Sequence, residues 1–249
     1  MNKKSRFTDA GENNSPKPVN PVEEKEKLSG LFVVSTPIGN LEDITLRALR
    51  VLRNVDLVAA EDTRHTRQLL SHFDIHVPLE SCHSFNEHRK VDELVGKIAA
   101  GMSVALVSDA GTPSVADPGY LLVNAALEAG IEPVVIPGVS ALTFSVTASG
   151  LPVDHFQFLA FAPVKPGKRQ KFFETIRDYD GTTFFFESPY RVDKTLREMQ
   201  EVLGGECRIA IIREATKLHE EIIRGTVGEI AGAGKAWKGE FVIGVCPVK

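Results

Sequence analysis

The chain has 249 residues and a net charge of −4, with a quarter of its residues charged and 43% apolar. This length suits one large domain or two small ones, and the composition is ordinary for a soluble protein. The charge lacks the basic excess typical of nucleic-acid binders, so any RNA contact must come from a local patch. Three distant cysteines without CxxC spacing argue against a disulfide framework or a zinc site.

The first 28 residues are polar and contain three prolines and a run of mixed charges over 23–27. We predict a disordered tail over residues 1–28. The tail lacks the apolar segment of a signal peptide, and no apolar run in the chain reaches membrane-spanning length. We therefore expect a cytoplasmic protein without a membrane partner.

From residue 31 onward, short apolar runs alternate with segments of helical period. The runs predict strands at 31–34, 55–60, near 79, 104–107 and 133–136, and helices at 44–53, around 69–73, at 86–100, from 117 to 130 and at 141–149. Strands that alternate with helices predict a mostly parallel sheet. The sequence thus indicates an α/β domain over residues 29–150.

The pattern breaks at Gly150-Leu151-Pro152 and then restarts, which predicts a second α/β domain over residues 151–249. Strands are expected at 156–161, 182–186, 208–213, 220–224 and 241–245, with helices at 168–177 and 191–203. The last two strands are expected to run antiparallel. The second sheet should therefore be mixed.

The stretch 103–120 contains the longest loop between a predicted strand and helix. Its strand stops at Ser108, and glycines and prolines then prevent regular structure until a helix that we expect to begin with Asp117 as N-cap and Pro118 at its first position. Ligands of open α/β folds bind at this edge of the sheet. An ordinary tight connection is the alternative, but such connections are usually shorter.

Three other loops of the first half follow predicted strands and are also small or polar, at 35–40, 61–64 and 137–140. In a parallel sheet all four loops emerge at one edge, which favours a pocket there. Neither a Walker loop nor a GxGxxG fingerprint is present, which argues against an NTPase and a standard dinucleotide enzyme.

Several of these segments carry a family resemblance. Residues 107–113 with 117–119 resemble the cofactor segment of the tetrapyrrole methylase superfamily, and residues 137–141 resemble its second cofactor segment. Segments 35–41, 60–66, 184–191 and 213–217 resemble the ribosomal RNA small subunit methyltransferase I branch. The resemblance covers about residues 31–245 and implies a two-domain class III methyltransferase fold with the cofactor in the cleft between the domains.

The resemblance also implies an activity. The cofactor would be S-adenosyl-L-methionine, and the reaction would methylate the ribose 2′-hydroxyl of a cytidine in the decoding region of 16S ribosomal RNA. The partner would be the small ribosomal subunit, and the chain would form a homodimer. Two other functions stay open: a tetrapyrrole C-methyltransferase, and a non-catalytic RNA-binding ribosome assembly factor.

Candidate cofactor-binding residues follow from these segments. The small side chains of Ala110 and Gly111 allow close backbone approach, whereas Asp109 either bonds the cofactor or caps its own loop. Ser140 either bonds the cofactor or caps a helix. Phe161 either packs against the adenine of the cofactor or belongs to the core. The full set is Pro37, Ser108, Asp109, Ala110, Gly111, Thr112, Ser114, Val115, Ser140, Ala141, Phe161 and Pro189.

Methyl transfer to a hydroxyl depends on alignment, and a base adds about a hundredfold or more. The candidate bases are Glu61, Asp62, Glu187 and Glu214, although Glu61 and Asp62 beside Arg64 also suit a structural ion pair. The densest basic run, 165–171, favours RNA binding, with a solvated helix start as the alternative. Candidate substrate-binding residues are Asn40, Arg64, Asn86, Lys168, Arg169, Arg191 and Lys217. No histidines have metal-ligand spacing, so no metal is expected.

Overall fold

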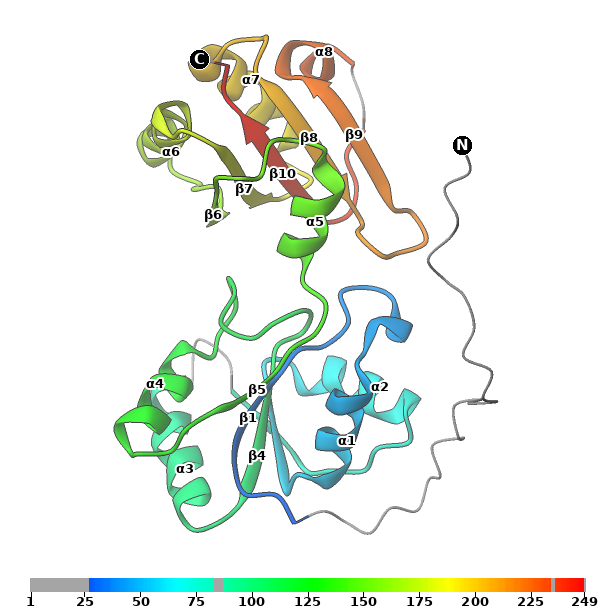
Figure 1. Cartoon of the computed structure of the whole chain (residues 1–249), viewed down its shortest axis with the longest axis vertical. Coiled ribbons are helices and arrows are strands. Elements are labelled where there is room, and N and C mark those ends of the chain that lie inside the picture. The colour runs from blue at the N-terminus through cyan, green and yellow to red at the C-terminus, as the bar shows by residue number, and fades with distance from the viewer. Residues whose placement is uncertain (1–26, 83–86, 234–235, 249) are drawn as a thin grey trace, which may run out of the picture.

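The computed structural model describes residues 27–82, 87–233 and 236–248. They form two lobes, each built around a five-stranded sheet (Figure 1). Most of the predicted tail of residues 1–28 lies outside the described residues. Within the described ranges, no helix combines the length and apolar character needed to cross a membrane.

The first lobe contains a sheet in which every paired strand runs parallel, in the order β3-β2-β4-β1-β5. The parallel sheet predicted for the first half is therefore confirmed. Its strands are β1 (Gly30–Val34), β2 (Leu57–Ala60), β3 (Leu79–Ser81), β4 (Ser103–Val107) and β5 (Val134–Ile136).

Helices cover both faces of this sheet (Figure 1). Phe32 and Ala105 point to the face that packs on α1, whereas Leu31 and Val104 point to the face under α3 and α4. Because both faces are buried, the strands read as continuous apolar runs in the sequence. The helices are α1 (Leu46–Asn54), α2 (Thr63–His72), α3 (Glu87–Ala99) and α4 (Tyr120–Glu128), with a short 3₁₀ helix η1 (Leu41–Asp43) before α1.

The second lobe contains a mixed sheet in the order β6-β7-β10-β8-β9. The β6–β7 pair is parallel, while β10 runs antiparallel to β7 and β8, and β9 runs antiparallel to β8, as predicted. The strands are β6 (Phe156–Phe161), β7 (Thr182–Glu187), β8 (Arg208–Arg213), β9 (Glu221–Thr226) and β10 (Phe241–Cys246).

One face of the second sheet packs on three helices, α6 (Pro166–Asp178), α7 (Val192–Leu203) and α8 (Val227–Ala231). The short helix α8 was not predicted. Its sequence signal is a capping box, in which Thr226 and Glu229 each bond the other residue's backbone N–H group.

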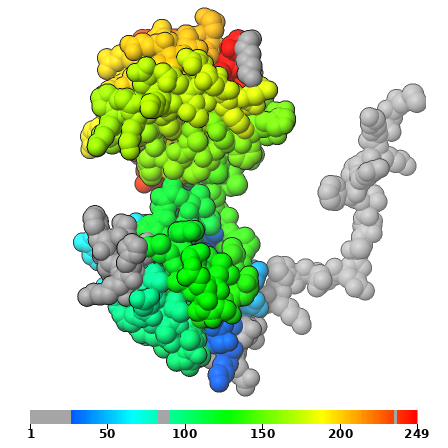
Figure 2. All heavy atoms as spheres, turned by 90° about the vertical axis from the view of Figure 1, so that its left-hand side faces the viewer, coloured from blue at the N-terminus to red at the C-terminus, as the bar shows by residue number. Residues whose placement is uncertain are grey.

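The opposite face of the second sheet packs on α5 (Ala141–Ser149), although we placed this helix in the first domain. Leu142, Phe144 and Val146 pack against Phe184 and Ile212. We therefore propose a division at residues 137–140 instead of 150. Figure 1 shows α5 beneath the upper sheet, and Figure 2 shows that the molecule narrows between the lobes.

The predicted start of α4 was wrong. The helix begins at Tyr120, and its N-cap is Gly119, at a φ of 131° that favours glycine. The N–H of Ser114 donates to the carbonyl of Pro118 at 3.2 Å, so residues 114–118 close on themselves before the helix starts. Asp117 therefore belongs to this closed loop and is not a helix cap.

The close packing of the second sheet predicts the effect of a small substitution. A Cβ atom at Gly244 in β10 would lie 2.6 Å from the Phe184 ring, so we expect Gly244→Ala to destabilise the protein by about 1–3 kcal/mol in urea unfolding. The control is Gly96→Ala in α3, where a Cβ would meet no atom within 4 Å. That variant should be about 0.5–1 kcal/mol more stable. Equal stability of the two variants would contradict the packing.

Candidate functional site

The loops at the carboxyl ends of β1, β4 and β5 are bonded to one another. Thr36 and Gly111 exchange two backbone hydrogen bonds, of 2.8 and 3.0 Å. The Ser35 hydroxyl bonds that of Thr112 at 3.0 Å, and the Ser35 N–H donates to the carbonyl of Ile136 at 3.2 Å. The predicted convergence of these loops is confirmed.

The loop after β2 joins the same edge through two aspartates. The N–H of Asp62 donates to a carboxylate oxygen of Asp109 at 3.0 Å. Asp62 is the N-cap of α2, and its carboxylate pairs with the exposed guanidinium of Arg64 at 2.7 Å. Hydrogen bonds from Arg64 hold the pKa of Asp62 far below its usual range. This geometry fits the structural ion pair that we considered for Asp62.

A cavity of about 360 Å³ lies between the two lobes. Its walls include eight of the predicted cofactor-binding residues, which come from both lobes. They are Ala110, Gly111, Thr112, Val115, Ser140, Ala141, Phe161 and Pro189. Four others, Pro37, Ser108, Asp109 and Ser114, are not among the lining residues.

Eleven further residues line this cavity although none of them was among the predicted cofactor-binding residues, and six of them lie in the segments that carry the family resemblance. They are Ile38, Asp117, Phe186, Glu187, Ser188, Ile212, Ala215, Gly239, Glu240, Phe241 and Val242. Glu187 had been proposed as a base, and Asp117 as a helix cap. The start of β10 was missed because this strand is antiparallel. Phe241 at its beginning pairs with Glu187 and Arg213 at the ends of β7 and β8. A strand start therefore lies at the edge where strand ends were expected.

Asp117 brings a half-buried carboxyl group to the cavity wall. Burial raises its pKa, a hydrogen bond with Ser108 opposes this, and the charge of Asp109 adds to the rise. The net result is a carboxyl group whose pKa lies above its ordinary value. An opposite charge entering the cavity would be attracted to its ionised form.

Ser140 and Phe161 both face the cavity. Ser140 is the N-cap of α5, yet its side chain makes no capping hydrogen bond, so the helix-capping alternative is not supported. Phe161 is 56% exposed, and its ring lies 5.2 Å from that of Phe186. It is therefore part of the cavity wall and not of the core.

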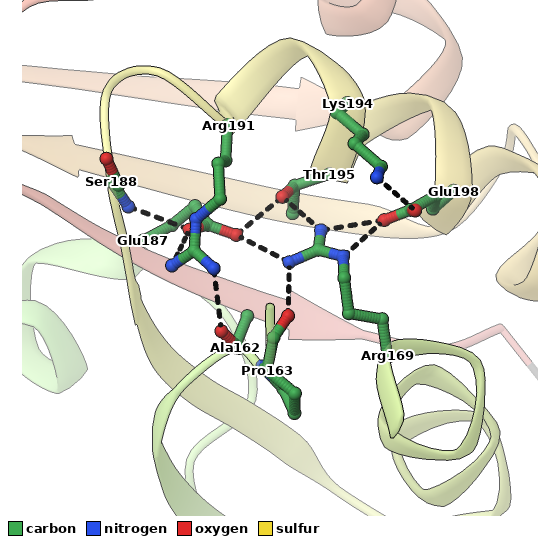
Figure 3. A network of polar contacts seen from close by, with 9 residues as sticks. All are labelled: Ala162, Pro163, Arg169, Glu187, Ser188, Arg191, Lys194, Thr195 and Glu198. Carbon is green, nitrogen blue, oxygen red and sulfur yellow. Dashed lines mark hydrogen bonds and ion pairs between the residues drawn. The ribbon is translucent and has the colours of Figure 1, made fainter. Parts of the chain in front are cut away.

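Behind the wall formed by Ser188 and Pro189, Glu187 is the centre of a buried polar network (Figure 3). One of its oxygens accepts from Thr195 at 2.6 Å and from Arg169 at 3.3 Å. The other accepts from the Ser188 N–H and pairs with Arg191, both at 2.7 Å. Both oxygens are occupied and the side chain has no exposed surface, so a role as the base does not fit Glu187.

Arg169 belongs to the same network and is only 2% exposed. Its guanidinium also donates to Glu198 and to the carbonyl of Pro163, at 2.7 and 2.9 Å (Figure 3). A direct RNA contact, which we expected from the basic run, does not fit this burial. Arg191 is partly exposed, but it also donates to the carbonyl of Ala162.

Lys217 lies at the cavity rim between two carboxylates. Its ammonium contacts Glu214 at 3.2 Å and Glu240 at 2.9 Å. Burial lowers the pKa of Lys217, but its bonds to the two carboxylates outweigh this effect and raise that pKa overall. Burial raises the pKa of Glu214, but hydrogen bonds from the Glu240 backbone and from Lys217 leave that pKa below its ordinary value. The aliphatic part of the Lys217 side chain packs directly on Gly39, where a Cβ atom would not fit. This contact connects the second lobe to the first.

The remaining substrate candidates are spread over the surface. Asn40 is exposed and caps η1 by accepting from the Glu42 N–H, and Lys168 is exposed on α6. Asn86 lies outside the described residues, and Glu61 does not line the cavity. Among the described residues, no cluster of His, Cys, Asp and Glu side chains is arranged to hold a metal ion.

Strained backbone surrounds the cavity. Five non-glycine residues next to lining residues have positive φ angles: Ser114 at 71°, Ala116 at 66°, Ala160 at 50°, Glu214 at 51° and Thr216 at 64°. Such conformations cost about 1–3 kcal/mol each and concentrate at functional sites. Their positions support the cavity as the site.

The model of the family Tetrapyrrole (Corrin/Porphyrin) Methylases matches residues 30–231. The chain belongs to the tetrapyrrole methylase family. Relatives named ribosomal RNA small subunit methyltransferase I include one from Halalkalibacterium halodurans, 43% identical over 223 residues, covering 89% of this chain and 77% of the relative. A second, from Mesorhizobium japonicum, is 47% identical over 222 residues, covering 88% and 76%. The resemblance to this branch of the tetrapyrrole methylases is confirmed.

Solved structures of tetrapyrrole methylases share the fold. The methyltransferase CobJ matches with a TM-score of 0.68 and 18% identity over 89% of this chain and 95% of its own. Uroporphyrin-III C-methyl transferase from Thermus thermophilus, complexed with S-adenyl homocysteine, matches with a TM-score of 0.60 and 18% identity over 87% and 97%. At these identities the likeness supports the fold alone, which agrees with the predicted two-domain α/β class.

The buried network predicts that substitution of two arginines of α6 will affect stability to very different extents. Arg169→Ala leaves Glu187 buried without one of its partners, so we expect a loss of about 3–5 kcal/mol in unfolding free energy. Arg177→Ala removes only an exposed pair with Asp178 and should leave the stability nearly unchanged. Denaturant titration of both variants tests this, and a small effect at Arg169 would contradict the network.

Proposed function

We propose that this chain is an S-adenosyl-L-methionine-dependent methyltransferase acting on the RNA of the small ribosomal subunit, at the ribose 2′-hydroxyl of a cytidine. The observation that carries the proposal is the cavity between the lobes, whose walls include residues from both segments that resemble the family's cofactor segments. Relatives at 43–47% identity, named ribosomal RNA small subunit methyltransferase I, support the substrate.

The cavity residues fit this cofactor. Phe161, Pro189 and Val242 offer apolar surface for an adenine, and Ala110 and Gly111 leave their backbone groups accessible. The cofactor carries a sulfonium and an ammonium charge, for which Asp117 supplies a carboxyl group. When bound, S-adenosyl-L-methionine supplies an electrophilic methyl group.

The contribution of the chain to methyl transfer is mainly positioning. The bonded loops of the first lobe and the network behind Pro189 hold opposite walls of the cavity, so a ribose hydroxyl and the cofactor can be aligned. Removal of the hydroxyl proton would add about a hundredfold. We propose that Glu214 or Glu240, held at the rim by Lys217, accepts this proton.

We propose a homodimer in the cytoplasm, the compartment where ribosomal subunits are modified. Large apolar side chains are exposed along α4 and the edge strand β5, among them Tyr120, Leu127, Val134 and Val135. Edge strands are usually protected, and a second copy would cover this one.

A methyl-transfer assay separates the candidate functions. The protein is incubated with labelled S-adenosyl-L-methionine and small ribosomal subunits that lack the modification, and the methyl group is mapped. We expect transfer to a cytidine 2′-hydroxyl. Transfer to a base would contradict the ribose assignment. Cofactor binding without transfer to RNA would favour a tetrapyrrole substrate, and absence of cofactor binding would favour an assembly factor.

The position of Asp117 predicts how cofactor binding depends on pH. Because its ionised form would attract the cationic cofactor, affinity should rise as pH increases through the raised pKa of Asp117. Asp117→Asn should abolish this rise and weaken binding at pH 7 by about tenfold or more in calorimetry. The exposed Asp154→Asn is the control.

Stability provides an independent check on the Asp117 variant. The raised pKa means that Asp117 favours the folded state at low pH and that this contribution is lost as pH rises. Without cofactor, Asp117→Asn should therefore be at least as stable as the parent at pH 7. Unchanged cofactor affinity in this folded variant would remove Asp117 from the cofactor site.

A further inference from the structure

Two loops at the rim of the cavity are bonded together and held from behind. Residues 162–165 follow β6, and residues 188–191 follow β7. The guanidinium of Arg191 donates to the carbonyl of Ala162 at 3.2 Å, and Arg169 donates to that of Pro163 at 2.9 Å (Figure 3). Since both arginines are anchored on Glu187, neither loop can shift without disturbing buried charges.

These rigid loops expose large apolar side chains to solvent. Tyr190 is 96% exposed and Val164 is 74% exposed. The two neighbours of Tyr190 are fixed, because Pro189 lines the cavity and Arg191 is bonded to Glu187. The backbone of Tyr190 is therefore held in place next to the cavity, while its ring extends into solvent and packs little against the rest of the described chain.

The loop that is bonded to that of Tyr190 leads into a run of lysines. Lys165 ends the first of the two loops, and Lys168 and Lys171 follow on the first half of α6; all three side chains are exposed. The N-terminal end of a helix adds a partial positive charge. In a chain with a net charge of −4, this is a local basic surface of the kind that tracks a phosphate backbone.

Tyr190 therefore follows a cavity-lining residue, on a loop bonded to the one that leads to the lysines. This arrangement matches the recognition of unpaired RNA bases, which stack on aromatic side chains while cations hold the backbone. We propose that Tyr190 is a stacking platform for a base of the RNA strand whose ribose enters the cavity. This inference rests on the proposed function and adds to it a single-stranded substrate segment and the residue that holds one of its bases.

The test uses the full chain with two probes, small ribosomal subunits and a fluorescently labelled single-stranded oligocytidine. Tyr190→Ala and Tyr190→Leu should both weaken oligocytidine binding and raise the KM for subunits, by roughly 5- to 150-fold, because both remove the ring. Tyr190→Phe should stay close to the parent. Cofactor affinity should be unchanged in all three, and Leu46→Ala, an exposed apolar residue of α1, is the control.

Other outcomes overturn the inference. If Tyr190→Leu keeps the parent's affinity while Tyr190→Ala loses it, the contact is apolar and not stacking. If only subunit binding weakens, the partner is a ribosomal protein, and if the oligomeric state changes, the partner is a second copy. If the parent methylates subunits and Tyr190→Ala does so equally well, Tyr190 has no role, whereas an inactive parent would refute the proposed function itself.

Discussion

A carboxylate with no exposed surface, that of Glu187, holds together the parts of the second lobe that face the cavity. Burial of an ionised group is costly unless partners compensate for lost hydration, and Glu187 has Arg169, Arg191 and Thr195 as partners. These residues come from α6, the loop after β7, and α7. The network therefore fixes α6, α7 and the loop after β7 relative to one another, and this keeps the cavity wall formed by that loop rigid.

The two lobes contribute different chemistry to the cavity. The first lobe supplies backbone groups from its loops, including the long strained loop after β4, together with the carboxyl group of Asp117. The second lobe supplies apolar surface, such as Phe161 and Val242, and a rim where Lys217 pairs with two carboxylates. A molecule that is cationic at one end and aromatic at the other has a complementary surface on each side.

Much of the fold was predictable from the sequence because buried strands appear as apolar runs and helices keep their period. The loops after β1, β4 and β5 were predictable as neighbours, since parallel strands end at one edge. The start of β10 at Phe241 was not, because it reaches that edge in the opposite direction. The extra turn that places Asp117 in the cavity depends on a bond between residues 114 and 118, which has no local signature.

Charged residues were the hardest to place. Arg169 and Lys168 are adjacent in one basic run, yet one is buried and the other exposed. Their difference arises from partners far along the chain, Glu187 and Glu198, which become neighbours only when α6 and α7 pack together. A run of basic residues therefore predicts a positively charged surface for the segment as a whole, but not which of its side chains are exposed.

The position of β10 has a consequence for the order in which the protein assembles during translation. The first sheet is complete once β5 has left the ribosome, because all its strands precede residue 137. The second sheet lacks its middle strand until residues 241–246 have emerged, since β10 follows the other four strands in the chain and pairs with both β7 and β8. The nascent chain must therefore keep the second sheet incomplete until β10 has emerged, and removal of β10 would damage the centre of that sheet and not its margin.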